Sequence, residues 1–273
     1  MLEFLSYSFM QRAFIVGNII GIIAPLIGVF LILKRLALIG HTISHVALAG
    51  VALGMILGVY PVYMAIIISV IAAFSIEKIR ENYDDYAEVS LSIILASGLG
   101  LATILISLYD DSAGIMSYLF GSITLVTRRD LYTVIPLGFV ILFIIFFFYY
   151  GFFYLTFNEK EAKLSGIPVK TLNILLMIIV SITVSLSLRI IGGLLISSLI
   201  TIPVATAMQL AQSFKHMIFY SILTGIIAVN GGLVISFYQD LAPGGTIILT
   251  TVVCLLMVIL YKKIKLSFKK KSI

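Results

Sequence analysis

Nine long apolar stretches dominate this sequence and decide what kind of structure it can form. They fall near residues 13–33, 40–59, 61–76, 89–108, 132–155, 171–188, 190–211, 217–238 and 244–261. A helix that spans a bilayer needs about 20 mostly apolar residues, because it rises about 1.5 Å per residue through a core about 30 Å thick. Continuous runs of this length exclude a membrane barrel, whose strands are short alternating segments. The pattern predicts an all-α, polytopic membrane protein with eight or nine transmembrane helices.

The composition excludes the soluble classes of protein. Of the 273 residues, 61% are hydrophobic and only 11% are charged, whereas globular proteins carry about a quarter charged residues. The net charge of +6 does not indicate a nucleic-acid partner, because much of it lies in a basic C-terminal tail, residues 262–273. The lone Cys254 gives no disulfide framework and no thiolate metal cluster. We expect residues 1–273 to form a single transmembrane domain.

The distribution of lysine and arginine predicts the orientation, because cytoplasmic loops carry an excess of both. If all nine stretches cross and the tail is cytoplasmic, fourteen of the 18 basic residues lie inside. The four that lie outside are Arg12, Arg128, Arg129 and Arg189. This register places the N-terminus outside. If one stretch is re-entrant, the count is eight and the N-terminus lies inside; the short run 61–76 and the polar start of 40–59 leave that alternative open.

Two of the three histidines, His41 and His45, lie one helical turn apart and therefore share a helix face. Imidazole nitrogens in this arrangement can bind one divalent cation with bonds of about 2.0–2.1 Å. Polar side chains in an apolar span are costly and are candidates for function. The alternative is that both histidines lie in the interface beside Lys34 and Arg35 and bind water. The spacing alone leaves both interpretations open.

Gly50, Gly54 and Gly58 follow the histidine pair at intervals of four residues. At about 100° per residue, these glycines lie opposite His41 and His45 around the helix. Small residues let a second helix approach closely. We expect the glycine face to pack on a neighbouring helix and the histidine face to line a path.

A polar segment, residues 157–170, separates two apolar stretches on the predicted cytoplasmic side. Within it, Glu161, Ala162 and Gly166 form E-A-x-x-x-G, which predicts a short helix ended by glycine. Such a helix could fill the membrane interface or dock onto a partner. Acidic residues elsewhere are expected to be solvated charges in loops or at segment ends. These include Asp84, Asp85, Asp110, Asp111 and Asp130.

The sequence does not support hydrolysis by this chain. Zinc metalloproteases carry a glutamate directly after the first histidine of H-E-x-x-H, and that position is Thr42 here. Ser97 is followed by Gly98, but the rest of a serine-protease G-x-S-G motif is missing. We therefore expect no catalytic residues.

Three stretches carry a family pattern. They are F-M-Q-R-A at 9–13 continuing to P-L-I-G-V-F-L-I-L-K-R at 25–35, L-I-G-H-T-I-S-H-V-A-L-A-G-V at 38–51, and E-A-x-x-x-G followed by G-G-L-L-I at 192–196 and I-P-V-A-T-A at 202–207. In order and spacing, they resemble the membrane permease subunits of ABC importers for zinc and manganese. The block around Ser44 and His45 is the most specific, whereas many ABC permeases share E-A-x-x-x-G.

The resemblance implies a helical subunit that pairs with a second copy and encloses a metal path at the dimer interface. It implies that separate cytoplasmic ATP-binding subunits hydrolyse ATP, and this chain has no G-x-x-x-x-G-K-[ST] loop of its own. It also implies an extracytoplasmic metal-binding protein that delivers the ion. The family commonly has aspartate where this chain has His41. Imidazole suits zinc, whereas manganese prefers oxygen ligands, so we expect zinc, with manganese or iron as the alternative.

Two other classes of function remain as alternatives. An ATP-independent carrier or channel would need acidic relay residues within its spans, and none is evident. A purely structural membrane protein would not need the histidine pair. We expect a multi-pass protein of a bacterial-type plasma or inner membrane, with the lipid bilayer as a partner, no nucleic acid and no permanently bound cofactor.

Overall fold

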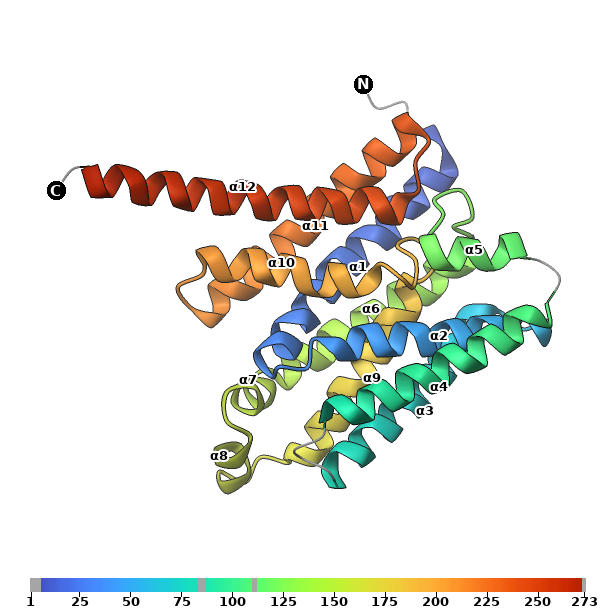
Figure 1. Ribbon diagram of the computed structural model, residues 1–273, viewed down its shortest axis with the longest axis horizontal. Helices are drawn as coiled ribbons and strands as arrows, with labels where there is room; N and C mark the ends of the chain where they lie inside the picture. Colours follow the sequence, from blue (N-terminus) through green and yellow to red (C-terminus); the bar gives the residue numbers. More distant parts are fainter. Residues whose placement is uncertain (1–5, 83–86, 110–111, 272–273) are drawn as a thin grey trace.

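A computed structural model describes residues 6–82, 87–109 and 112–271, and its regular elements are helices (Figure 1). The twelve α-helices of this described part are α1 (Ser8–Leu33), α2 (Leu38–Ile56), α3 (Pro61–Asn82), α4 (Ala87–Ser107), α5 (Ser112–Phe120), α6 (Arg128–Phe147), α7 (Tyr149–Phe157), α8 (Glu159–Leu164), α9 (Val169–Ser187), α10 (Ile196–Leu210), α11 (Phe214–Gln239) and α12 (Pro243–Lys271). The predicted all-α membrane fold is confirmed.

Eight of the described helices are long and apolar enough to cross a membrane: α1, α2, α3, α4, α6, α9, α11 and α12. Helix α10 has only 15 residues and is therefore about 22 Å long. It nevertheless runs from one end of the bundle to the other. It begins beside α5, and it ends where Gln209 accepts a hydrogen bond of 3.2 Å from Lys262 of α12. Figure 1 shows that α1 begins and α12 ends at opposite ends of the bundle.

The structure corrects several predicted boundaries. The stretch 190–211 is not one helix, because residues 188–195 form turns and only 196–210 are helical. The stretch 132–155 is divided between α6 and α7, with a break at Phe148. The run 61–76 is longer than predicted, because α3 continues to Asn82. The basic tail is a continuation of α12 as far as Lys271, and residues 272–273 lie outside the described part.

The irregular segment before α10 is buried against the end of α5. Irregular backbone at membrane depth is tolerated only where protein covers it and satisfies its polar groups. Here the amide of Ser122 donates to the carbonyl of Arg189 at 2.9 Å, and the amide of Gly193 donates to the carbonyl of Tyr118 at 2.8 Å. Gly192 has φ +91°, and a Cβ there would lie 2.3 Å from the Leu119 carbonyl oxygen. The close approach therefore requires glycine.

Helices α1 and α11 pack closely against each other. Their backbones touch at Gly21 and Gly225, where an added Cβ on Gly225 would lie 2.3 Å from the Gly21 carbonyl oxygen. One turn from this contact, Asn18 and Asn230 exchange side-chain hydrogen bonds of 3.1 and 2.7 Å. Small residues and paired amides are common at contacts between membrane helices. The pair supports α6, α9 and α10 around it.

Candidate functional site

His41 and His45 lie on one face of α2, as their spacing predicts. Their ring centroids are 4.6 Å apart, with the rings nearly perpendicular. His45 is buried, with 8% exposure, and its Nδ1 atom is buried without a hydrogen-bond partner. His41 is half-buried, and its carbonyl accepts a hydrogen bond of 2.7 Å from the Ser44 hydroxyl. Buried polar atoms are normally paired, so the unpaired nitrogen of His45 is available to a ligand.

Within the described residues, no group of three or more His, Cys, Asp or Glu side chains is arranged to hold a metal ion. One chain therefore offers two imidazole donors at this place. A tetrahedral zinc ion takes four ligands. The remaining ligands would have to come from water or from a second copy of the chain.

The histidines lie toward the start of α2, the end nearer to Lys34. At 1.5 Å per residue, His45 lies about 3 Å and His41 about 9 Å from the helix midpoint. The helix is continuous through Gly40, which is buried within it. The chain reverses earlier instead, at Arg35, whose φ is +60°.

The opposite face of α2 packs on α3 through Gly50 and Gly54. A Cβ on Gly50 would lie 2.6 Å from the Cα of Ala65, and one on Gly54 would lie 2.8 Å from the Cα of Pro61. The prediction is wrong for Gly58, which lies beyond the end of α2 with φ +66° and open space around its Cα. Gly58 therefore shapes the turn into α3 and is not part of the helix contact.

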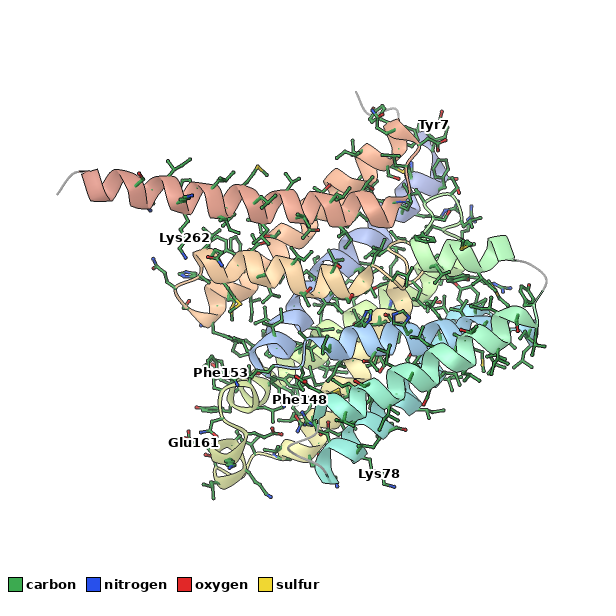
Figure 2. The ribbon with its side chains drawn as sticks, in the orientation of Figure 1. Tyr7, Lys78, Phe148, Phe153, Glu161 and Lys262 are labelled. Atoms are coloured by element: carbon green, nitrogen blue, oxygen red, sulfur yellow. The ribbon has the colours of Figure 1, made fainter. Side chains whose placement is uncertain are left out.

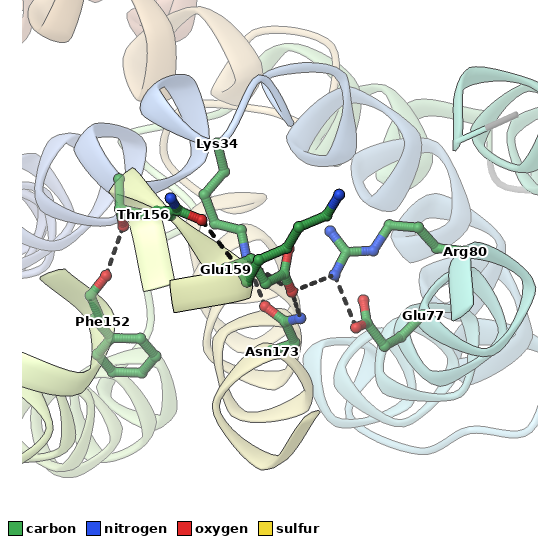
Figure 3. Close-up of polar contacts among 9 residues, drawn as sticks. Lys34, Glu77, Arg80, Phe152, Thr156, Glu159 and Asn173 are labelled. Carbon is green, nitrogen blue, oxygen red and sulfur yellow. Dashed lines mark hydrogen bonds and ion pairs between the residues drawn. The ribbon is translucent and has the colours of Figure 1, made fainter. Parts of the chain in front are cut away.

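A polar cluster joins four elements at the Lys34 end of the bundle (Figure 3). Lys34 donates to the side-chain oxygen of Asn173, whose amide nitrogen donates to Glu159. Glu159 also lies 3.8 Å from both Lys34 and Arg80, and Arg80 is 2.9 Å from Glu77. Burial lowers the pKa of Lys34 to about 8, and Glu159 opposes part of that shift. The cluster ties α8 to α1, α3 and α9.

Two acidic residues differ from the expectation of solvated charges. Glu77 lies inside α3 and is 3% exposed, and Asp130 in the first turn of α6 is also 3% exposed. Each of these charges lies close to the end of a predicted apolar run. The helix extends beyond that run and includes the charge. Asp84, Asp85, Asp110 and Asp111 lie outside the described residues.

The segment 157–170 contains α8. A side chain caps the start of this helix, and backbone hydrogen bonds cap its end. The side chain of Asn158 accepts hydrogen bonds of 3.2 Å from two amides of the first turn. At the other end, Gly166 has φ +78°, and the Ile167 amide donates to the Ala162 carbonyl at 3.1 Å. This is a Schellman ending, which favours glycine. Ala162 is buried, whereas Glu161, labelled in Figure 2, is exposed.

A second buried charge cluster lies at the other end of the bundle and was not predicted. Tyr60 donates to Asp130, and Asp130 lies 3.6 Å from Nε of Arg189. The guanidinium of Arg189 lies over the ring of Tyr118, 4.8 Å from its centroid. Burial raises the pKa of Tyr60, and its hydrogen bond to Asp130 raises it further. These contacts join the starts of α3 and α6 to α5 and to the irregular segment before α10.

Comparison with known proteins places the chain among metal permeases. The model of the ABC 3 transport family matches residues 6–262. The high-affinity zinc uptake system membrane protein ZnuB of Haemophilus influenzae is 29% identical, over 87% of this chain and 91% of that protein. The manganese import system permease protein ScaB of Streptococcus parasanguinis is 32% identical, over 92% and 90%.

A solved structure shares the fold. It is PsaBC from Streptococcus pneumoniae in complex with Fab, with a TM-score of 0.84 and 33% identity, covering 93% of this chain and 92% of that one. The family model covers nearly the whole length of the chain, including the histidine pair, α8 and the segment before α10. The chain is a multi-pass membrane protein that belongs to the ABC 3 transport family.

Proposed function

We propose that this chain is the membrane-spanning permease subunit of an ATP-driven importer of divalent metal ions, with zinc as its preferred ion. Two copies enclose the path, and His41 and His45 of each copy form the transit site. A separate cytoplasmic subunit binds and hydrolyses ATP, and an extracytoplasmic protein delivers the metal. Support comes from the family and from relatives whose names state zinc or manganese transport.

The observation that carries the proposal is the buried, unpartnered Nδ1 atom of His45 beside the ring of His41. A neutral imidazole is a good ligand for zinc, and a nitrogen left without a partner in an apolar bundle destabilises the protein. A transported ion that binds there temporarily removes this cost. A transit site must also release its ion, and two donors per chain favour weaker binding than a complete set of four.

The preference for zinc rests on the donor chemistry. The described part of the chain brings no carboxylate to the histidine pair, and manganese binds best to carboxylate and water oxygens. The two named relatives do not decide between the metals, because they have similar identities to this chain. Manganese is therefore the second candidate.

We assign the coupling of ATP hydrolysis to transport to residues 157–170. Helix α8 presents Glu161 to solvent, and Leu164 at its end is 88% exposed. This face of α8 is therefore open to contact with a partner. Behind it, Glu159 joins α8 to the Lys34 cluster. Contact with an ATP-binding subunit would therefore be transmitted to the helices that carry the metal path.

The decisive experiment measures transport in proteoliposomes that contain the permease with its ATP-binding subunit. Zinc and manganese uptake are measured separately for the wild type, His41→Ala and His45→Ala. The matched control is His216→Ala, because His216 is exposed at the start of α11. We expect zinc uptake to fall at least tenfold in both site variants and to remain unchanged in the control. Unchanged zinc uptake in both site variants would rule out the transit site.

Co-purification separates the ATP-driven importer from its alternatives. An ATP-independent carrier or channel retains no nucleotide-binding subunit and transports metal without ATP. The proposal predicts that affinity-tagged permease retains an ATP-binding subunit and that uptake stops when ATP is withheld. Metal uptake at an equal rate without ATP would contradict it.

A further inference from the structure

A cleft of about 310 Å³ opens between the first turns of α1 and α6, at the end of the bundle opposite α8. Helix α1 lines it with Ser8, Gln11 and Arg12, and helix α6 lines it with Arg128 and Tyr132. Tyr7, labelled in Figure 2, directly precedes Ser8 in the sequence. The transit site and the coupling segment use none of these residues.

Within the described residues, no carboxylate balances the charge of the cleft. No acidic residue is among the described residues that line it, and neither Arg12 nor Arg128 makes an ion pair within the described part of the chain. The Nε atom of Arg12 is buried and has no hydrogen-bond partner. Two guanidinium groups around one cleft, one of them with a buried unused donor, are the kind of groups that bind an anion.

The position of the cleft along the helices matches the level of lipid headgroups. Arg12 is the fifth residue of α1 and therefore lies about 6 Å from its start. The polar layer on each side of a bilayer core is about 5–8 Å thick. Tyr7 and Tyr132 are 51% and 77% exposed, and tyrosines gather at this interface.

An apolar strip continues from the cleft along the outer face of α6. Phe139, Phe143 and Phe146 are 68%, 67% and 82% exposed, which suits contact with acyl chains rather than with water. In the predicted orientation, the two arginines lie on the outer side of the membrane, where basic residues are normally few. Binding of an anion would account for the two arginines at this place.

We infer that this cleft binds the phosphodiester group of an anionic phospholipid of the outer leaflet. The guanidinium groups of Arg12 and Arg128 donate to the phosphate oxygens, a pairing that arginine makes with good geometry. The acyl chains of the lipid lie along the phenylalanine strip of α6. A lipid is favoured over a water-soluble anion or a protein, because the cationic cleft and the apolar strip are continuous at the depth of the interface.

The test measures lipid binding to the purified permease dimer by native mass spectrometry during titration with phosphatidylglycerol. Arg12→Gln and Arg128→Gln are each expected to weaken binding about tenfold, because each removes a charged hydrogen-bond donor. The matched control is Arg129→Gln, which removes the same charge from an exposed neighbour outside the cleft. Its phosphatidylglycerol binding should equal that of the wild type. Melting temperatures of all variants verify that they are folded.

Three outcomes would overturn the inference. Unchanged lipid binding in the double variant Arg12→Gln/Arg128→Gln would exclude the cleft as the site. Equal competition by soluble glycerol phosphate would identify a site for a free anion. Loss of binding to the extracytoplasmic metal-binding protein, with lipid binding unchanged, would assign the arginines to a protein contact. Each of these results is independent of zinc uptake, so the inference can fail while the proposed function stands.

Discussion

The Nζ atom of Lys34 lies 3.8 Å from a carboxylate oxygen of Glu159, and both groups contact the side chain of Asn173. Lys34 directly follows α1 and precedes the turn into α2, whereas Glu159 is the first residue of α8. The contact therefore connects the proposed coupling helix to the start of the helix that carries both histidines. If α8 is the coupling helix, we expect its movement to reach α2 through these polar contacts.

The depressed pKa of Lys34 predicts how stability depends on pH. Burial lowers this pKa from 10.5 to about 8, so between these values the unfolded chain binds a proton that the folded chain lacks. The free energy of unfolding therefore rises as the pH increases from about 8 to 10.5, by on the order of 1–3 kcal/mol. We expect the melting temperature in detergent to rise over this range.

Lys34→Met should remove this part of the pH dependence, because the titrating group is gone. Lys215→Met is the matched control, since Lys215 is exposed, and it should keep the wild-type profile. Identical pH profiles for the wild type and Lys34→Met would show that Lys34 does not titrate as described.

Gly166→Val should separate ATP hydrolysis from metal uptake. Gly166 has φ +78° and ends α8, and a β-branched residue is strained in that conformation. The matched control is Gly166→Asn, because asparagine tolerates this conformation. Metal uptake per ATP hydrolysed should fall severalfold for valine and little for asparagine, with normal membrane insertion of both. Full coupling in the valine variant would count against docking by α8.

Gly50→Ala should destabilise the bundle by about 1–3 kcal/mol. The new Cβ would lie 2.6 Å from the Cα of Ala65, and backbone cannot move aside as a flexible side chain can. Gly100→Ala in α4 is the control, because a Cβ there meets nothing within 4 Å. Melting temperatures in detergent should fall for the first variant and stay level or rise for the second. A wild-type melting temperature for Gly50→Ala would refute the close contact of α2 with α3.

His41→Asp should shift the ion preference from zinc toward manganese. The change replaces a nitrogen donor with an oxygen donor, and manganese favours oxygen. The readout is the ratio of manganese to zinc uptake in proteoliposomes, which should rise at least several-fold. His216→Asp makes the same substitution at an exposed position and should leave the ratio unchanged. An unchanged ratio in His41→Asp would mean that position 41 does not set the preference.

Asp130→Asn should be more damaging than Tyr60→Phe. The first change removes the charge that faces the partly buried Arg189, and breaking a buried ion pair costs about 3–5 kcal/mol. The second removes one hydrogen bond, worth about 1 kcal/mol. Melting temperature and yield should rank wild type, Tyr60→Phe and Asp130→Asn in descending order. A smaller loss for Asp130→Asn than for Tyr60→Phe would contradict the ion pair.

Much of the fold follows from the sequence, because the bilayer imposes simple rules on a chain. The apolar stretches predicted the membrane helices, and the i, i+4 spacing predicted that His41 and His45 share a face of α2. The E-A-x-x-x-G pattern predicted a short helix, and Gly166 ends it. These features depend on hydrophobic length, helical period and the conformational freedom of glycine, which are local properties.

The remaining features were decided only by the tertiary structure. The break before α10 is as apolar as a helix, and it is stable because α5 supplies hydrogen bonds to its backbone. Lys34 and Asn173 are 139 residues apart in sequence. No pattern in either segment predicts that the two side chains meet. Hydrophobicity and periodicity determine which segments enter the membrane. Which buried charges and amides meet there depends on how the helices pack, because a polar group in an apolar bundle is stable only beside a partner that another helix provides.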